Sequence, residues 1–415
     1  MHKKRILFLM HEGVESTIFQ SQVAVHALEM QELGYEIEIW TFETTLKSLG
    51  SSLRNVAHAE TLSTSRVRLL RGIYQFLPFS DLINALVLLF HIRHSSQRFD
   101  LVHARTDYSA SVYSYIARFV RAPMVWDCRG DSFHETEHSL SKRPRVPRFV
   151  KRPILRAIID QETRAGNACS VANFVSKGLF ERKSRSLHGK PHFVIPCAVS
   201  SKYFYFDAQL RVEYRSRLGF DRDAVVLVYS GAMSTYQGFE KYADLVLQIL
   251  LTGDQRVRFL VVTPDHARAM DHLVDRLPRR VYTLCSASYE EMNGYLNAAD
   301  YGALLRERNR INDVSSPTKF GESCLAGLPV ILDGNVQQAR EISAEVGNSE
   351  SYEAVVSGKT LVPVQNDERA QIASRSQRIF ARRYLNATYD EMYRAALNDI
   401  SGSRPAALDR RPRSR

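Results

Sequence analysis

The sequence predicts an α/β fold made of two successive halves, each with a mostly parallel sheet. Short apolar runs alternate with segments of helical periodicity along most of the chain, which is the pattern of βαβ units. The pattern starts again after about residue 205. The chain has 415 residues, which is too many for one typical hydrophobic core, so two domains are expected.

In the first half, the strand candidates are apolar runs that end in polar or glycine-containing loops. Between the first two runs, the segment 20–33 has helical spacing, with Val23, Leu28 and Leu33 on one face. A further helix is expected over 110–119. We expect strands at 5–10, 36–42, 101–104, 122–127, 171–176 and 192–197.

The second half repeats this order, and the seam between the two falls near 198–208. We expect strands at 224–231, 257–264, 280–286, 301–305 and 328–332, with helices such as 289–299 between them and a long helix over 368–400. The expected domains are 1–200 and 205–380, followed by a terminal helix over 381–400 and a disordered basic tail over 401–415.

The composition limits the class of protein. A net charge of +11 suits a phosphate-bearing ligand, an anionic membrane or nucleic acid, but the basic clusters lack a recognisable nucleic-acid module. The five cysteines are widely spaced, so we expect buried thiols of a cytoplasmic protein, with neither disulfides nor a metal site. The apolar run ILFLM is too short for a signal peptide, and no run reaches the ~18–20 residues that span a bilayer.

The most informative stretch is SSPTKFGESCLAGLPVIL, at 315–332, which predicts a short helix before a buried strand. Ser316 is the expected N-cap, and Thr318 and Lys319 fall in the first turn, where free N–H groups and the helix dipole favour phosphate. Glu322 lies one turn deeper, where a carboxylate could accept two hydrogen bonds from a ribose diol. Together these features describe a nucleoside diphosphate site, and the alternative is a capped helix with surface charges.

Polar side chains also follow two strands of the first half. The run WDCRGDSFHETE places Asp127, Arg129 and Glu135 at a strand end, where ligands of open α/β sheets bind. The run HARTDYS places His103 and Arg105 at the end of the preceding strand. Solvated loop charges are the alternative for the first group, and a buried core histidine is the alternative for His103.

Two loops contain glycine and small polar residues at the ends of the first strands of the two halves. HEGVESTIFQSQV includes Glu15 and Ser16 and suits contact with a substrate. YSGAMSTYQG includes Gly231 and Gly238, which would allow close approach of the backbone to a ligand. This loop is not a G-x-G-x-x-G motif, so a dinucleotide fingerprint is not supported.

These motifs resemble the family 4 retaining glycosyltransferases, whose GT-B fold has two Rossmann-like domains that face each other across a cleft. The run S-P-T-K-F-G-E, with the following G-L-P-V-I, resembles the donor-site helix of that family, and YSGAMSTYQG resembles its glycine loop. WDCRGDSFHE resembles the D-x-R-G variant of enzymes of surface-polysaccharide assembly, and HEGVESTIFQSQV resembles their acceptor-side loop. The likeness covers roughly 5–398.

The resemblance implies a hexosyltransferase that moves a hexose or N-acetylhexosamine, with retention, from a nucleotide-diphosphate sugar of the UDP or GDP type. The acceptor would be a glycan or a lipid-linked glycan in capsule, O-antigen or exopolysaccharide synthesis, and no cofactor or metal would be needed. Two rivals stay open: a non-catalytic two-lobe protein that binds nucleotide sugars, and a nucleotide-sugar epimerase of the same fold.

The resemblance also implies roles for individual residues. In the donor domain, Glu322 would hold the ribose, and Gly231 would let the phosphates approach. The start of the helix would hold the diphosphate through Ser316, Thr318 and Lys319, with Arg306 or Arg308 helping because the usual Lys-Gly of the glycine loop is Gln237-Gly238 here.

In the first domain, the residues expected near the reacting carbon are Asp127, Arg129 and Glu135. Those expected to contact the acceptor are Glu15, Ser16, His103 and Arg105. In the GT-B fold the final helix often packs back on the first domain, and the sequence permits that here.

Two basic and apolar stretches predict peripheral docking to the cytoplasmic face of a membrane. Residues 66–94 are apolar with basic flanks, and residues 138–159 contain a run of Lys and Arg without any acid. Each basic residue near an anionic surface contributes ~1 kcal/mol. The alternative is a solvated basic face on an ordinary helix.

Overall fold

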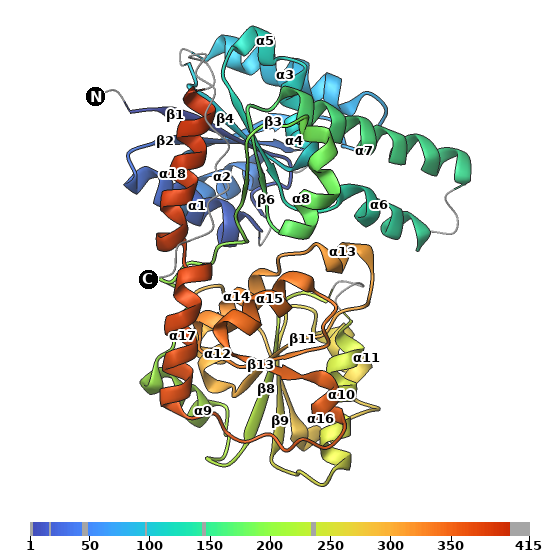
Figure 1. Cartoon of the computed structure of the whole chain (residues 1–415), viewed down its shortest axis with the longest axis vertical. Helices are drawn as coiled ribbons and strands as arrows, with labels where there is room; N and C mark the ends of the chain where they lie inside the picture. The colour runs from blue at the N-terminus through green and yellow to red at the C-terminus, as the bar shows by residue number, and fades with distance from the viewer. Residues whose placement is uncertain are drawn as a thin grey trace. The chain divides into compact units, whose positions relative to one another are not determined.

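The computed structural model describes residues 3–15, 18–43, 49–95, 98–142, 147–233 and 238–398. The chain divides into two compact units (Figure 1). Unit 1 comprises Met1–Ile195 and Asn386–Arg415, and unit 2 comprises Pro196–Leu385. The predicted α/β class with two Rossmann-like domains is confirmed, since each unit contains one parallel sheet with alternating helices.

The sheet of unit 1 has seven parallel strands in the order β3-β2-β1-β4-β5-β6-β7. Its strands are β1 (Arg5–Met10), β2 (Glu36–Glu43), β3 (Arg66–Arg71), β4 (Leu101–Arg105), β5 (Met124–Cys128), β6 (Val171–Phe174) and β7 (His192–Val194). Its helices are α1 (Val25–Glu32), which continues a π-helical turn at Phe19–Ala24, α2 (Leu49–Ser63), α3 (Ser80–His94), α4 (Thr106–Ser114), α5 (Ala117–Val120), α6 (Ser132–Ser141), α7 (Arg148–Ala168) and α8 (Lys177–Lys183), with a 3₁₀ turn at Ser184–Leu187. The strand order reverses between β1 and β4, which is the topological switch point where ligands of such sheets bind.

The sheet of unit 2 has six parallel strands in the order β10-β9-β8-β11-β12-β13. Its strands are β8 (Val225–Ser230), β9 (Val257–Val262), β10 (Tyr282–Cys285), β11 (Tyr301–Leu304), β12 (Val330–Leu332) and β13 (Ser349–Ser351). Its helices are α9 (Ala208–Arg217), α10 (Phe239–Leu251), α11 (His266–Leu273), α12 (Met292–Ala298), α13 (Arg310–Asp313), α14 (Thr318–Leu325), α15 (Gln337–Val346), α16 (Tyr352–Val356) and α17 (Asn366–Phe380), with a 3₁₀ turn at Arg279–Val281. The switch point of this sheet lies between β8 and β11.

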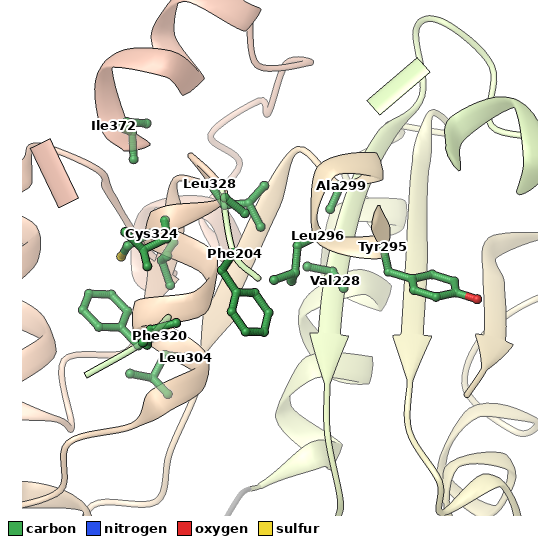
Figure 2. Close-up of a cluster of buried hydrophobic side chains, with 14 of the residues drawn as sticks. Phe204, Val228, Tyr295, Leu296, Ala299, Leu304, Phe320, Cys324, Leu328 and Ile372 are labelled. Atoms are coloured by element: carbon green, nitrogen blue, oxygen red, sulfur yellow. The ribbon is translucent and has the colours of Figure 1, made fainter. Parts of the chain in front are cut away.

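Both faces of the second sheet are buried, as expected for a parallel sheet covered by helices. Along β8, Val226 and Val228 belong to one hydrophobic cluster, whereas Val225 and Leu227 belong to the other. Figure 2 shows the first cluster, in which Val228 and Leu304 of the sheet meet side chains of several helices and Phe204. The labelled helix residues in this view are Tyr295, Leu296, Phe320, Cys324 and Ile372. This packing positions α12, α14 and α17 on one face of the sheet.

The structure corrects the sequence predictions at four places. β3 is absent from the predicted strands, because Arg66–Arg71 opens one long apolar stretch, and β13 is absent from them, because Ser349–Ser351 lacks an apolar pattern. The helix expected over 110–119 is divided into α4 and α5. The helix expected over 368–400 is divided into α17 and α18 (Arg382–Asn398) at the extended residue Ala381, which forms a parallel bridge with Val199.

Among the described residues, no helix is long and apolar enough to cross a bilayer. The five cysteines, all within the described residues, are thiols and not disulfides, and all but Cys285 are buried. The predicted disordered tail at 401–415 lies outside the described residues.

A buried arginine joins the helices on one face of the second sheet. The guanidinium of Arg369 in α17 donates to the carbonyl oxygens of Asn297 (2.7 Å) and Ala299 (3.0 Å), at the C-terminal end of α12. It also donates to the carbonyl oxygen of Ala326 at the end of α14 (2.7 Å). The carboxyl end of a helix carries partial negative charge, and Arg211 Nη1 also donates to the carbonyls of Asn297 (3.1 Å) and Ala299 (2.6 Å). Two guanidinium groups therefore share the end of α12, and Arg369 adds the link to α14.

Gly327 follows Ala326 at the end of α14, and the geometry of the backbone there requires glycine. Gly327 has φ +76°, and a Cβ atom there would lie 2.4 Å from the carbonyl oxygen of Arg369. Any other residue would be strained by its backbone angle and would push α14 away from α17.

We expect Arg369→Met to lower the free energy of unfolding of unit 2 by ~2 kcal/mol, because the Ala326 carbonyl loses its bond from Arg369, while the carbonyls of Asn297 and Ala299 keep the donor from Arg211. Thermal and urea unfolding, followed by circular dichroism, measure the effect. The matched control is Arg375→Met, on the same helix but exposed. Equal unfolding midpoints for the two variants would contradict the role assigned to Arg369.

Candidate functional site

A pocket lies at the switch point of the second sheet, at the carboxyl ends of β8 and β11. It is lined by Val228, Tyr229, Ser230, Tyr242, Ala303, Leu304, Arg306, Lys319, Phe320 and Ser323. The residues come from β8, α10, β11 and α14, and from the segment directly after β11. Two of the residues predicted from the sequence, Arg306 and Lys319, are therefore brought together in one pocket.

The glycine after β8 makes room for the lysine. Gly231 has φ +102°, and its N–H donates to the carbonyl of Val262 at 2.8 Å. A Cβ atom at Gly231 would lie 2.2 Å from Nζ of Lys319, so only glycine lets the ammonium group lie against this backbone. The same Nζ lies 5.5 Å from the ring centroid of Tyr229, within reach of a cation–π attraction.

Hydrogen bonds hold the backbone of Arg306 in place, and its side chain is buried. Its N–H donates to Asp333 Oδ2 (2.7 Å), and its carbonyl accepts from Lys241 Nζ (2.6 Å) and Asn335 Nδ2 (2.9 Å). Within the part of the chain that the structure describes, Nε and Nη1 of its guanidinium have no hydrogen-bond partner. Buried donors on a charged group are costly unless an anion pairs with them. Arg308, the other cation considered, is exposed.

Burial changes the protonation of both charged residues of α14. Burial and the neighbouring Arg306 lower the pKa of Lys319 to about 8, although Glu322 and Asp265 act in the opposite direction. Burial raises the pKa of Glu322 to about 7, with Lys319 opposing the rise. Both groups therefore titrate near neutral pH, which is frequent at functional sites. Glu322 does not line the pocket itself, but its charge interacts with that of Lys319.

The start of α14 differs from the prediction. The helix begins at Thr318 with Pro317 in the cap position, so the expected N-cap role of Ser316 is wrong. The Ser316 hydroxyl instead accepts a hydrogen bond from the N–H of Cys197 at 2.9 Å, which anchors the segment that precedes the helix. Neither Ser316 nor Thr318 lines the pocket.

In unit 1, a group of charged side chains lies at the ends of β4 and β5. Asp127 is buried, and its Oδ1 accepts from Asn173 Nδ2 at 2.8 Å. Oδ2 of Asp127 lies 3.2 Å from His103 Nε2, and Oδ1 lies 3.5 Å from Arg129 Nη1. Burial by itself would raise the pKa of Asp127, but Arg129, His103 and Arg105 outweigh it and hold that pKa well below its usual range. Asp127 therefore stays ionised.

His103 is a buried histidine packed in the core, so any effect it has on a ligand would pass through Asp127. Its ring stacks on Phe8 at a centroid distance of 4.5 Å. Its Nδ1 lies 2.9 Å from the hydroxyl of Tyr393 in α18, and the same hydroxyl lies 2.8 Å from His26 Nε2.

Two residues that the sequence reasoning missed complete this group. Glu12 follows β1, and its Oε1 accepts from Arg105 Nε at 2.8 Å, across the switch point of the first sheet. Gln22 Oε1 accepts from both Arg105 Nη2 (3.0 Å) and Arg129 Nη2 (2.8 Å). Glu12, like Glu15, is an acidic residue in the loop after the first expected strand, so its position in the sequence could have identified it.

The remaining predicted residues lie elsewhere or outside the described residues. Glu15 is exposed and accepts from Asn55 Nδ2, and Ser16 and Gln237 lie outside the described residues. Glu135 is exposed and lies against Gly130. The charges that act on Glu135 are those of Lys183, Asp107 and Asp131, so it is not grouped with Asp127.

The comparisons with known proteins concern the fold. No family model matches the chain, and no curated protein matches it in sequence. The structure is similar to sucrose-phosphate synthase from Thermosynechococcus elongatus, with 12% identity, a TM-score of 0.69, and coverage of 97% of this chain and 100% of that one. It is similar to Anabaena HepE in complex with UDP and glucose, with 15% identity, a TM-score of 0.64, and coverage of 95% and 100%. It is also similar to a glycosyltransferase from Rickettsia africae, with 13% identity, a TM-score of 0.65, and coverage of 96% and 100%.

These similarities extend over nearly the whole of each chain. They confirm the predicted GT-B fold, with its two Rossmann-like domains. At identities of this size, similarity establishes the fold alone, so activity has to be argued from the side chains.

We expect Glu322→Gln to stabilise the protein without ligand at pH 8, and to do so much less at pH 5. With a folded pKa of about 7 against an ordinary value of 4.5, the native carboxyl keeps its proton while the unfolded one loses it. The free energy of unfolding therefore falls as pH rises from 4.5 to 7, by up to roughly 3 kcal/mol, and glutamine avoids this loss.

Thermal unfolding of wild type and variant at the two pH values measures this effect. Glu341→Gln, an exposed carboxylate on α15, is the control that should not change. A gain for Glu322→Gln that is the same at pH 5 and pH 8 would show that the Glu322 carboxyl has an ordinary pKa.

Proposed function

We propose that the chain is a retaining glycosyltransferase that transfers a hexose or N-acetylhexosamine from a nucleotide-diphosphate sugar, of the UDP or GDP type, to a glycan or lipid-linked acceptor. The observation that carries the proposal is the buried guanidinium of Arg306, with two nitrogens unpartnered among the described residues, next to the half-buried Lys319. Two neighbouring cations at a sheet switch point, one buried and one half-buried, favour a ligand with more than one negative charge.

The comparisons support the donor class. One protein of similar fold, HepE, was crystallised with UDP and glucose and also with UDP-glucose. Another is described as a glycosyltransferase. A uridine diphosphate sugar carries its charge on the diphosphate, which is the chemistry that Lys319 and Arg306 suit.

The proposed mechanism is electrostatic. Cleavage of the sugar–phosphate bond leaves growing negative charge on the nucleoside diphosphate, and fixed cations that face this charge lower the barrier. Lys319, Arg306 and the N-terminus of α14 would supply the positive charge, and Gly231 would let the phosphates approach. Ionised Glu322 would accept hydrogen bonds from the ribose diol.

In unit 1 the proposed acceptor side is the group around Asp127. Asp127 stays ionised, and Arg129 and Arg105 are held in place by Gln22. An ionised carboxylate flanked by fixed guanidinium groups suits the hydroxyl groups of a sugar. Retention, and a role in capsule, O-antigen or exopolysaccharide synthesis, rest on the resemblance of 126–137 and 11–23 to that group of enzymes.

We expect one of UDP, GDP, ADP, CMP and dTDP to raise the Tm by several degrees, because a ligand at about 100 times its Kd adds ~2.7 kcal/mol to stability. Lys319→Met and Arg306→Met should remove the shift, since both remove charge that faces the diphosphate. Differential scanning fluorimetry with each nucleotide makes the measurement.

The control is Arg340→Met, which removes an exposed cation on α15. A shift that persists in both site variants would place the nucleotide elsewhere. Binding without transfer or hydrolysis of any sugar donor would favour the non-catalytic protein, and a changed donor sugar without acceptor would favour the epimerase.

A further inference from the structure

Helix α3 buries polar side chains against the rest of unit 1. Asp81 is buried and accepts from Ser111 Oγ at 2.9 Å and from Arg164. Asn84 is also buried. Its side-chain amide accepts a hydrogen bond from the N–H of Ile73 at 2.9 Å and donates one to the carbonyl of Ile73 at 3.0 Å. These contacts fix the rotation of α3 and attach the preceding loop to it.

The outward face of the same helix is apolar. It carries Phe79, Leu82, Ile83, Leu86 and Phe90, whose spacing places them along one side of the helix. Phe79 is 76% exposed, and Leu86 and Phe90 are each 58% exposed. An ordinary surface helix has the reverse arrangement, and contiguous exposed apolar side chains mark an interaction surface.

The exposed charges that flank α3 in the sequence have one sign. Between Arg71 and Arg98, Asp81 is the single acidic residue of the sequence, and it is buried in an ion pair with Arg164. Arg71, Arg93 and Arg98 are exposed. An apolar stripe with a basic rim is complementary to a surface that is anionic outside and apolar beneath, and a second copy would bring like charges together.

We propose that α3 lies in the interface of an anionic lipid membrane, with its apolar stripe at the boundary between headgroups and acyl chains. Leu82, Leu86 and Phe90 would enter that boundary, and the arginines would stay at the level of the lipid phosphates. The proposal does not depend on the transferase reaction, because it rests only on α3 and the residues around it.

Co-sedimentation with vesicles tests this proposal. We expect the full chain to bind vesicles of phosphatidylglycerol and phosphatidylcholine at 0.1 M salt. The double variant Leu86→Ser/Phe90→Ser should bind at least roughly tenfold more weakly, because two apolar side chains no longer leave water. Both positions are exposed, so circular dichroism and Tm should match wild type.

The matched control is Val212→Ser/Leu251→Ser, which removes two apolar side chains that are 69% and 71% exposed in unit 2. This variant should bind vesicles as wild type does. Three results would overturn the proposal: no binding to anionic vesicles, binding that the α3 variant retains, or equal binding to vesicles of phosphatidylcholine alone. Light scattering that shows a wild-type dimer and a monomeric α3 variant would instead assign the stripe to a second copy.

Discussion

The position of α14 in the second unit depends on a buried cation, the guanidinium of Arg369, which shares the carbonyls at the end of α12 with Arg211. It binds carbonyl oxygens at the ends of α12 and α14, and Gly327 lets the two chain segments approach to contact distance. Because α14 is short, a fixed C-terminal end determines where its first turn lies. The positions of Lys319 and Glu322 follow from that constraint, and with them the charge of the pocket.

In the pocket, the guanidinium of Arg306 has fewer hydrogen-bond partners than that of Arg369. Among the described residues, Arg369 donates to several backbone carbonyls and leaves its Nε without a hydrogen-bond partner, whereas Arg306 leaves both Nε and Nη1 without one. Burial also moves the pKa values of Lys319 and Glu322 toward neutrality, which means that their charged forms are destabilised without a ligand. Hydrogen bonds to backbone carbonyls thus hold the frame of the second unit, and the guanidinium of Arg306 in the pocket keeps buried donors that a bound anion would pair.

The sequence was sufficient for the fold class and for most strands, because buried parallel strands are short apolar runs that alternate with helices. It failed at Ser349–Ser351, where pairing with β12 alone makes the strand, and at Ser316, whose hydroxyl bonds Cys197, far away in sequence. The Lys319 and Arg306 pair could be anticipated from strand ends and motif spacing. The bonds of Glu12 and Gln22 to Arg105 could not, because these residues meet only when β1 and β4 become neighbours in the sheet.

The central claim is that Lys319 and Arg306 bind the diphosphate of a nucleotide. The most direct test compares the affinities of UDP and uridine, and of GDP and guanosine, by titration calorimetry in wild type and in the Lys319→Met/Arg306→Met double variant. We expect wild type to bind the diphosphate much more tightly than the nucleoside, and this preference to disappear almost completely in the variant. An equal preference in the two proteins would contradict it and would place the diphosphate outside this pocket.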